Sequence, residues 1–225
     1  MRLPDAIASI LFPPKCVLCG RVLEGDEADL CHRCRVEVPV LEKPKTKRQF
    51  LADWTAVWYY EGTVRRSLLR YKFYGRRNYA PAYGRLLAMK LQREFEEGFD
   101  LITWVPISRW RRLRRGYDQV ELLARAVGAE LGTEPVCLLK KIRNNPPQSR
   151  ITGQAQRRAN VLGVYEAVDR EAFAGKRVLL LDDIITTGAT AGECARVLLT
   201  AGAEEVSCAA MAAAKHQNKQ NKTSR

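Results

Sequence analysis

The stretch that decides the fold is residues 177–190, Arg-Val-Leu-Leu-Leu-Asp-Asp-Ile-Ile-Thr-Thr-Gly-Ala-Thr. Four consecutive apolar residues, 178–181, predict a strand that is buried on both faces. Asp182 and Asp183 follow at its carboxyl end, and a Thr/Gly loop then leads into a helix predicted over 189–201. Because ligands of open α/β sheets bind at the carboxyl ends of strands, we expect a ligand site at this point.

The loop after the two acids has the chemistry of a phosphate site. Backbone N–H groups, the hydroxyls of Thr186 and Thr187 and the positive end of the helix dipole can together hold a phosphate monoester. Gly188 would let the backbone approach the ligand closely. Carboxylates repel phosphate, so we assign Asp182 and Asp183 to the two hydroxyls of a ribose and to a bound cation.

The same stretch is compatible with two other interpretations. An apolar strand that ends in Asp is also found in nucleotide-hydrolysing ATPases, but these need a GxxxxGK[ST] loop, which the sequence lacks. An ordinary strand, turn and helix with a capping Asp is the simplest alternative.

The flanking segments alternate between strand and helix patterns. Strands are predicted at 54–60, 101–105, 136–139 and 206–211. Helices are predicted at 64–73 and 79–97 and from Asp118, whose partner Glu121 completes a capping box, to a stop at Gly132. Residues 143–156 read as a long loop. This alternation predicts an α/β fold with a mostly parallel sheet flanked by helices.

Four N-terminal cysteines have the spacing of a metal site. Two CxxC pairs, separated by eleven residues, can supply four thiolates to one tetrahedral zinc ion, and a closed four-sulfur site is structural. The pairs are Cys16 with Cys19 and Cys31 with Cys34. The N-terminus does not have the pattern of an export signal, so we expect the cysteines to lie in a reducing compartment, where metal binding is favoured over disulfides. A redox dithiol and four unrelated cysteines are the alternatives.

The formal net charge of the 225 residues is +13, which predicts an anionic partner. Residues 101–160 hold 12 basic and 4 acidic groups, a net charge of +8.

With only two histidines in the chain, His-centred catalysis is a poor first hypothesis. No apolar run reaches the roughly 20 residues that a transmembrane helix needs. A short amphipathic helix is expected near the N-terminus.

The 177–190 stretch resembles the phosphoribosyl pyrophosphate (PRPP) signature of type I phosphoribosyltransferases. With the cysteine-rich N-terminus it resembles the ComF family, associated with competence and DNA uptake in bacteria. Further matches are Phe12-Pro13-Pro14, Tyr71-Lys72-Phe73, Arg115-Gly116-Tyr117-Asp118-Gln119, Val105-Pro106, Gln148 and Asn160. Asp118 departs from the family, which usually has Asn there. Its added charge would weaken pyrophosphate binding unless Asp118 serves purely as a helix cap.

The resemblance implies roles for particular residues, although it leaves the catalytic group unknown. PRPP, or a related phosphoribosyl ligand, would bind with Mg²⁺ at Asp182, Asp183, Ile184, Thr186, Thr187, Gly188, Ala189 and Thr190. The pyrophosphate loop would begin at Pro106, Ile107 and Ser108. A flexible hood over 143–160 would close the site. Further pyrophosphate or hood candidates are Arg115, Gln119, Gln148, Arg157, Arg158 and Asn160.

Residues 109–115 hold five arginines in seven positions. Some of these side chains can bind pyrophosphate, since a guanidinium forks onto phosphate oxygens. Alternatively, they form a groove for single-stranded DNA on which Trp110 stacks a base. The DNA-binding candidates are Arg109, Trp110, Arg111, Arg112 and Arg114. A solvated basic face is the third interpretation.

The sequence therefore predicts a type I phosphoribosyltransferase-like domain over 51–214. An N-terminal helix, zinc-ribbon module and charged linker precede it over 1–50, and a disordered basic tail follows over 215–225. The expected role is PRPP binding in the uptake of single-stranded DNA, in the cytoplasm or at the inner face of the membrane, with DNA-uptake proteins as partners. The alternative is an active phosphoribosyltransferase or amidophosphoribosyltransferase-like enzyme of nucleotide metabolism without a DNA role.

Overall fold

The computed structural model describes residues 13–146, 151 and 153–215. Its centre is a parallel four-stranded sheet in the order β1-β6-β5-β2. The strands are β1 (Trp54–Tyr59), β2 (Leu101–Trp104), β5 (Arg177–Ile185) and β6 (Glu205–Ala213). The predicted parallel sheet is thus confirmed, and β5 occupies a central position in it.

The apolar run of β5 is explained by a core on each face of the sheet. Leu179 and Leu181 belong to one buried cluster, whereas Val178 and Leu180 belong to the other. Successive side chains of a strand point to opposite faces, so a strand covered on both sides must be apolar throughout.

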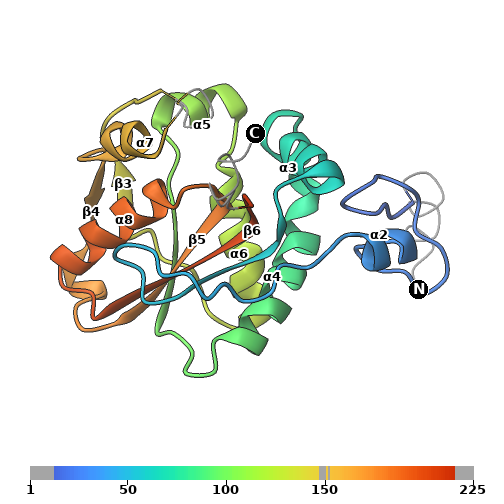
Figure 1. The fold of residues 1–225 in the computed structure, drawn as a ribbon, viewed down its shortest axis with the longest axis horizontal. Helices are drawn as coiled ribbons and strands as arrows, with labels where there is room; N and C mark the ends of the chain where they lie inside the picture. Colours follow the sequence, from blue (N-terminus) through green and yellow to red (C-terminus); the bar gives the residue numbers. More distant parts are fainter. Residues whose placement is uncertain (1–12, 147–150, 152, 216–225) are drawn as a thin grey trace, which may run out of the picture.

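Helices cover both faces of the sheet (Figure 1). Buried side chains of α3 (Gly62–Phe73), α4 (Ala80–Glu94) and α6 (Gln119–Leu131) join the first core. Those of α8 (Ala189–Thr200) join the second. A separate antiparallel pair of strands is formed by β3 (Leu139–Lys141) and β4 (Tyr165–Ala167). This pair lies beside α8, as does α7 (Gln154–Val161).

The N-terminal module packs against the helices of the first core. Cys16, Val17 and Leu18 are almost fully buried there, together with Leu68 of α3. The short helix α2 (His32–Glu37) begins directly after Cys31 and contains Cys34, so it carries the second cysteine pair. Across the interface, Arg85 of α4 pairs with Asp29, with a shortest N–O distance of 2.5 Å. The module therefore contributes to the hydrophobic core of the whole chain.

The segment predicted as a charged linker lies against the sheet instead of crossing open solvent. The Leu41 N–H donates to the Val57 carbonyl, and the Ala52 N–H donates to the Val206 carbonyl. The indole N–H of Trp54 donates to the Thr46 carbonyl at 2.7 Å. These bonds fix residues 41–54 along the domain.

Several predicted elements differ from the structure. The strand expected at 136–139 is β3, three residues later, and β5 runs four residues past the predicted end at 181. The last residues of the loop expected over 143–156 belong to α7, which begins at Gln154. The arginine-rich segment forms the helix α5 (Arg109–Arg115). Two short 3₁₀ helices, Arg77–Tyr79 and Arg170–Ala172, complete the elements of the described residues.

Some predictions fall outside the described residues: the helix near the N-terminus, Phe12, Gln148 and the tail from residue 216 onward. Within the described part of the chain, none of the helices is long and apolar enough to span a membrane.

Gly84 tests the packing of α4 on α6. A Cβ atom placed on Gly84 would lie 2.5 Å from the Ala126 Cβ and 2.7 Å from its carbonyl carbon. In a free helix, Gly→Ala stabilises by about 1 kcal/mol. Here we expect Gly84→Ala to lower the free energy of unfolding by about 1–3 kcal/mol, because overpacking forces the helices apart.

Urea denaturation followed by circular dichroism measures this change. Met89→Ala on the exposed side of α4 is the control and should shift stability by less than about 0.5 kcal/mol. A Gly84→Ala protein as stable as wild type would contradict the close packing.

Candidate functional site

The two acids of β5 lie inside the strand and point to opposite faces of the sheet. Asp183 contacts side chains from α3 and α6, whereas Asp182 lies near Lys141 of β3 and Cys194 of α8. Both carboxylates are buried. The site is therefore built around two acids that share a strand and have different neighbours.

Asp183 is held by two hydrogen bonds from distant parts of the chain. Lys72 Nζ donates to Oδ1 at 2.8 Å, and Gln119 Nε2 donates to Oδ2 at 2.9 Å. Arg115 Nη1 in turn donates to Gln119 Oε1 at 2.8 Å. Gln119 and Arg115 were predicted site residues, whereas Lys72 was noted only as part of a motif. Each carboxylate oxygen has a further lone pair, so Asp183 can accept another hydrogen bond in addition to these two.

Asp182 has a different electrostatic environment. Burial, and then the charge of Asp183, raises the pKa of Asp182 to about 8. One of its oxygens accepts from the Asp183 N–H at 2.8 Å. Burial, followed by the charge of Arg111, lowers the pKa of Lys141 to about 8. Lys141 also lies over the Tyr165 ring, 5.3 Å from its centroid. Lys141 was not predicted as a site residue, because nothing in its local sequence distinguishes it from a surface lysine.

The predicted phosphate loop follows β5 directly. Gly188 has a φ of 79°, a conformation that glycine adopts without strain, and stands at the N-terminus of α8. The Ala189 N–H donates to Thr187 Oγ1 at 3.3 Å. The residues from Ile184 to Thr190, with Asp182, line a cavity of about 20 Å³. The loop thus brings its hydroxyls and N–H groups next to one of the two acids.

Arg48, which was not predicted as a site residue, lies against the outer side of this loop. Its Nη2 donates to the Thr186 carbonyl at 3.4 Å, and its guanidinium lies over the Trp54 ring at 4.1 Å. A Cβ atom on Gly188 would come within 2.7 Å of Arg48 Nη1. A larger residue at this position would displace the Arg48 side chain from the loop.

Asp118 serves as a helix cap. Its Oδ1 accepts from the Val120 N–H at 2.9 Å and the Glu121 N–H at 3.2 Å. Its Oδ2 accepts from the Ile107 N–H at 3.1 Å, so it also ties the predicted pyrophosphate loop to the start of α6. The carboxylate is buried and accepts three backbone N–H groups, two from α6 and one from Ile107, so it does more than cap the helix.

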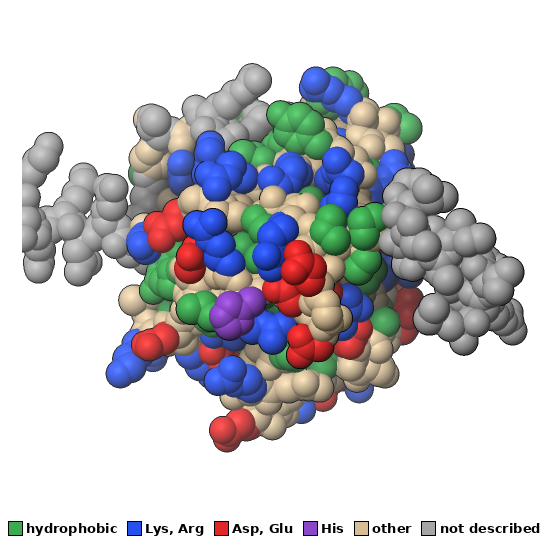
Figure 2. All heavy atoms as spheres, turned by 90° about the vertical axis from the view of Figure 1, so that its right-hand side faces the viewer, with side chains coloured by type: hydrophobic (Ala, Val, Ile, Leu, Met, Phe, Trp, Pro, Cys, Tyr) green, Lys and Arg blue, Asp and Glu red, His purple; other side chains and the backbone are tan. Residues whose placement is uncertain are grey.

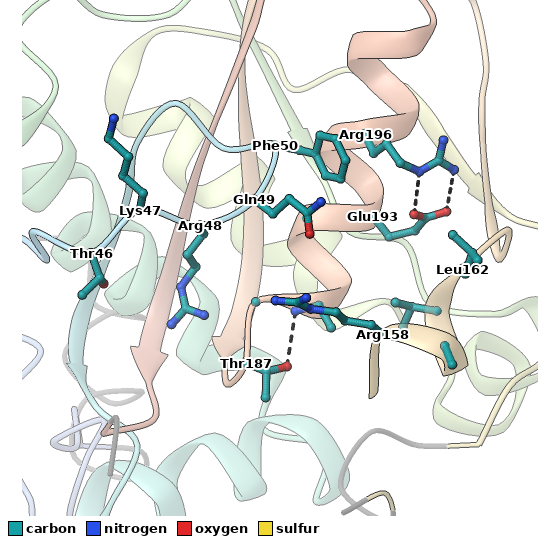
Figure 3. A pocket seen from close by; sticks show the side chains of 15 residues that line it. Thr46, Lys47, Arg48, Gln49, Phe50, Arg158, Leu162, Thr187, Glu193 and Arg196 are labelled. Carbon is teal, nitrogen blue, oxygen red and sulfur yellow. Dashed lines mark hydrogen bonds and ion pairs between the residues drawn. The ribbon is translucent and has the colours of Figure 1, made fainter. Parts of the chain in front are cut away.

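The described part of the predicted hood is tied together by its own side chains. Asn145 Nδ2 donates to the Asn160 carbonyl at 2.7 Å, and Asn160 Nδ2 donates to the Pro146 carbonyl at 3.1 Å. Arg157 Nε donates to the Ile151 carbonyl at 2.9 Å. Asn160 and Arg157 therefore hold the hood together, whereas Arg158 points into a separate pocket beside α8 (Figure 3).

The arginine-rich helix α5 has two different sides. It begins at Ser108, whose Oγ accepts from the Arg111 N–H, and ends at Gly116 with a φ of 76°. Arg111 and Arg115 lie one turn apart and are half-buried toward the site, with Arg111 bound to the Asn145 carbonyl at 2.9 Å. The remaining candidates, Arg109, Trp110, Arg112 and Arg114, are exposed.

The four predicted metal ligands come together. The sulfur atoms of Cys16, Cys19, Cys31 and Cys34 all lie within 4.8 Å of one another. A tetrahedral zinc ion with Zn–S bonds of about 2.3 Å separates its sulfurs by about 3.8 Å. The Sγ atoms of Cys19 and Cys31 are 3.7 Å apart. The cluster therefore fits a structural zinc ion.

Comparisons with known proteins agree with both parts of the structure. Residues 113–224 match the family model described as a phosphoribosyl transferase domain, and residues 7–48 match the double zinc ribbon domain. Competence protein F of Haemophilus influenzae is 32% identical over 48% of this chain, and the match spans about half of that protein, 47%.

Two further relatives match along most of the chain. Competence protein ComFC of Streptococcus pneumoniae is 28% identical over 85% of this chain and 96% of its own. The DNA utilization protein YhgH of Escherichia coli O157:H7 is 26% identical over 85% of this chain and 86% of its own. These matches confirm that the chain belongs with the ComF proteins, with a phosphoribosyltransferase domain and a zinc-ribbon domain.

Zinc content tests the cysteine cluster. We expect about one zinc ion per chain, and a loss of most of it in Cys31→Ser, because one of four tetrahedral ligands is removed. The melting temperature should also fall, since three of the four ligands, Cys16, Cys31 and Cys34, belong to the buried core. Metal analysis and thermal unfolding measure both effects. Cys137→Ser, a change outside the cluster, is the control and should leave the zinc content unchanged.

The pH dependence of stability tests Asp182. Its pKa is raised to about 8 in the folded protein, well above the value of about 4 for an unfolded chain. Between these values the folded state keeps a proton that the unfolded chain releases, so Asp182 makes stability fall as the pH rises from 4 to 8. Urea titrations across this range should show a shallower fall for Asp182→Asn. Equal slopes would contradict the raised pKa.

Proposed function

We propose that this protein binds PRPP, or a related phosphoribosyl ligand, and acts in the uptake of DNA during competence. The biological role is inferred from the relatives named as competence and DNA utilization proteins. The single observation that carries the ligand is the placement of two buried acids next to a phosphate loop at the end of one strand.

In the proposed complex, the 5′-phosphate lies on the loop from Thr186 to Thr190. The N-terminus of α8 adds its positive dipole end, and the Thr hydroxyls add donors. The ribose hydroxyls then face the β5 acids, with Asp182 on one side of the strand and Asp183 on the other. A hydroxyl can donate to a carboxylate or accept from a protonated one, so the raised pKa of Asp182 is compatible with this role.

The pyrophosphate of the ligand would lie on the cationic side of the site. Arg115 and Lys72 are linked to Asp183 from α5 and α3, and Arg111 and Lys141 lie toward Asp182. A ligand that takes one bond of Asp183 would release Lys72 toward its phosphate oxygens. The Ile107 loop, fixed by Asp118, would form the remaining wall.

The residues near the site do not form a ready-made Mg²⁺ cage. In the described part of the chain, the cysteine cluster is the one group of three or more side chains placed to hold a metal. Mg²⁺ commonly binds through substrate phosphates and one or two carboxylates. We therefore propose that it enters on the pyrophosphate oxygens, where it would neutralise charge on the leaving group.

Turnover of PRPP is the second candidate activity, and the ring of cations around the acids favours it. Lys72 and Arg115 lie near Asp183, and Lys141 lies near Asp182 and Arg111, so each acid has cations beside it that would stabilise charge on a departing pyrophosphate. An assay of pyrophosphate release with PRPP, Mg²⁺ and bases, nucleosides or DNA separates the two. Release with any acceptor supports an enzyme, and tight binding without release supports a binding protein.

PRPP binding itself is tested by changing both acids. We expect Asp182→Asn with Asp183→Asn to weaken PRPP binding in the presence of Mg²⁺ by at least about 100-fold, because the charge-assisted hydrogen bond of Asp183 and the carboxyl group of Asp182 are both lost. Isothermal titration calorimetry measures the affinity. Asp169→Asn with Glu171→Gln removes two exposed acids and should bind like wild type. Unchanged binding in the β5 variant would refute the assignment.

Contact with DNA is tested on the exposed side of α5. Replacing Arg109, Arg112 and Arg114 by Ala should flatten the salt dependence of single-stranded DNA binding, because fewer counterions are released. Fluorescence anisotropy from low to high salt gives the slope. Replacing Arg33, Arg65 and Arg93 by Ala removes the same charge from other exposed positions. Equal slopes in the two variants, or no binding by wild type at low salt, would contradict the interface.

A further inference from the structure

The N-terminal module has an outer face of mixed charge and an inner face that is buried against α3. Figure 2 shows basic and acidic side chains interspersed on the face of the molecule that carries α2. On the inner side, Val17 and Leu18 are almost fully buried in the first core. These residues stand between the first two cysteines of the cluster, Cys16 and Cys19. The module is thus joined to the domain through the segment 16–19, which we call the zinc knuckle.

Two polar side chains of α3 bind the backbone of the zinc knuckle. Ser67 Oγ donates to the Val17 carbonyl, and Arg70 Nη2 donates to the Leu18 carbonyl at 2.5 Å. Ser67 is fully buried, and its Oγ also lies 2.7 Å from Tyr83 Oη. Ser67 and Arg70 are three residues apart, so they lie on the same side of the helix. Both carbonyls stand between two ligands of the cluster, so metal binding would fix their positions.

The last turn of α3 reaches the candidate ligand site. Lys72 Nζ donates to Asp183 Oδ1 at 2.8 Å, and the Lys72 side chain is 20% exposed. Tyr71 Oη donates to the Gln119 carbonyl at 2.6 Å, and Tyr117 Oη donates to the Tyr71 carbonyl at 2.5 Å. The same turn therefore supplies one partner of Asp183 and contacts the backbone of the other.

The position of Lys72 depends on the contacts of this turn. The chain leaves the core directly after Lys72, since Phe73 is 58% exposed and Tyr74 is 73% exposed. A lysine has a flexible four-carbon stem, so its ammonium group stays at one carboxylate oxygen only if its backbone is held. The hydrogen bonds of the last turn to the zinc knuckle and to Gln119 supply that support.

We propose that Ser67 and Arg70 are positioning residues of the ligand site, which hold α3 against the zinc knuckle and thereby keep Lys72 at Asp183. The zinc module would then contribute to ligand affinity from outside the site, through one helix. The consequence for PRPP rests on the proposed function. The position of Lys72 does not, so the two can be tested separately.

Acetylation by limiting acetic anhydride, followed by mass spectrometry, measures how firmly Lys72 is held without any ligand. An amine that is hydrogen-bonded and mostly buried reacts when its surroundings open locally. We expect Arg70→Ala to raise the rate at Lys72 by about fivefold, the factor by which one lost hydrogen bond shifts a local equilibrium. Ser67→Ala should act in the same direction. Arg70→Lys should restore most of the slow reaction, since its ammonium group can donate to the Leu18 carbonyl.

Two controls separate positioning from a general loss of stability. Lys140, whose side chain is 52% exposed, is the internal reference and should react at the same rate in every variant. Phe173→Leu weakens the second core, and Lys72 should react in it as in wild type. The proposal is overturned if Arg70→Ala leaves the rate at Lys72 unchanged, if Phe173→Leu raises that rate as much, or if Arg70→Lys restores none of the protection.

PRPP affinity is the second measurement. Calorimetry with Mg²⁺ should show binding that is about fivefold weaker in Arg70→Ala, although the variant keeps its four cysteine ligands. Removal of zinc by a chelator should weaken binding at least as much. Wild-type affinity in Arg70→Ala together with faster acetylation of Lys72 would overturn the role of α3 in ligand binding. If wild type does not bind PRPP, the proposed function fails, and the acetylation rates still decide the position of Lys72.

Discussion

The carboxylate of Asp183, buried in the middle of a parallel sheet, constrains the elements around it. A buried charge is tolerated only when it is paired and hydrogen-bonded. Its two partners, Lys72 and Gln119, stand 111 and 64 residues away in the chain. The fold must therefore bring α3 and α6 to the same face of β5. Arg115 also lies in the site, because it donates a hydrogen bond to Gln119. Asp118 precedes Gln119 in the chain and accepts a hydrogen bond from the Ile107 N–H, which fixes the Ile107 loop to the same arrangement.

The elements that the sequence predicted correctly are those whose signals are local. The apolar run of β5, the Asp118 cap and the CxxC spacing each depend on a few neighbouring residues. The errors have tertiary causes: β5 continues beyond the acids because Ile184 and Ile185 still pair with β6. The helix α5 was missed because its seven residues depend on the cap at Ser108 and the stop at Gly116 more than on an apolar stripe.

The candidate site shows the same division. The acids and the phosphate loop could be named from one stretch of sequence, and Gln119 and Arg115 from the resemblance. Lys141 and Arg48 could not, since their place in the site depends on contacts with Tyr165 and Trp54 in the folded chain. A basic residue in a polar segment looks the same whether it faces solvent or a ligand.

The contact of Arg48 with Gly188 has a consequence for how such a protein can evolve. The arginine stands at the end of the residues that match the zinc ribbon, and the glycine stands in the loop of the other domain. A side chain at position 188 would push the Arg48 guanidinium away from the loop, and a different linker would leave the loop without this outer wall. Exchanging one domain for that of another protein would therefore also change the surroundings of the loop at Gly188.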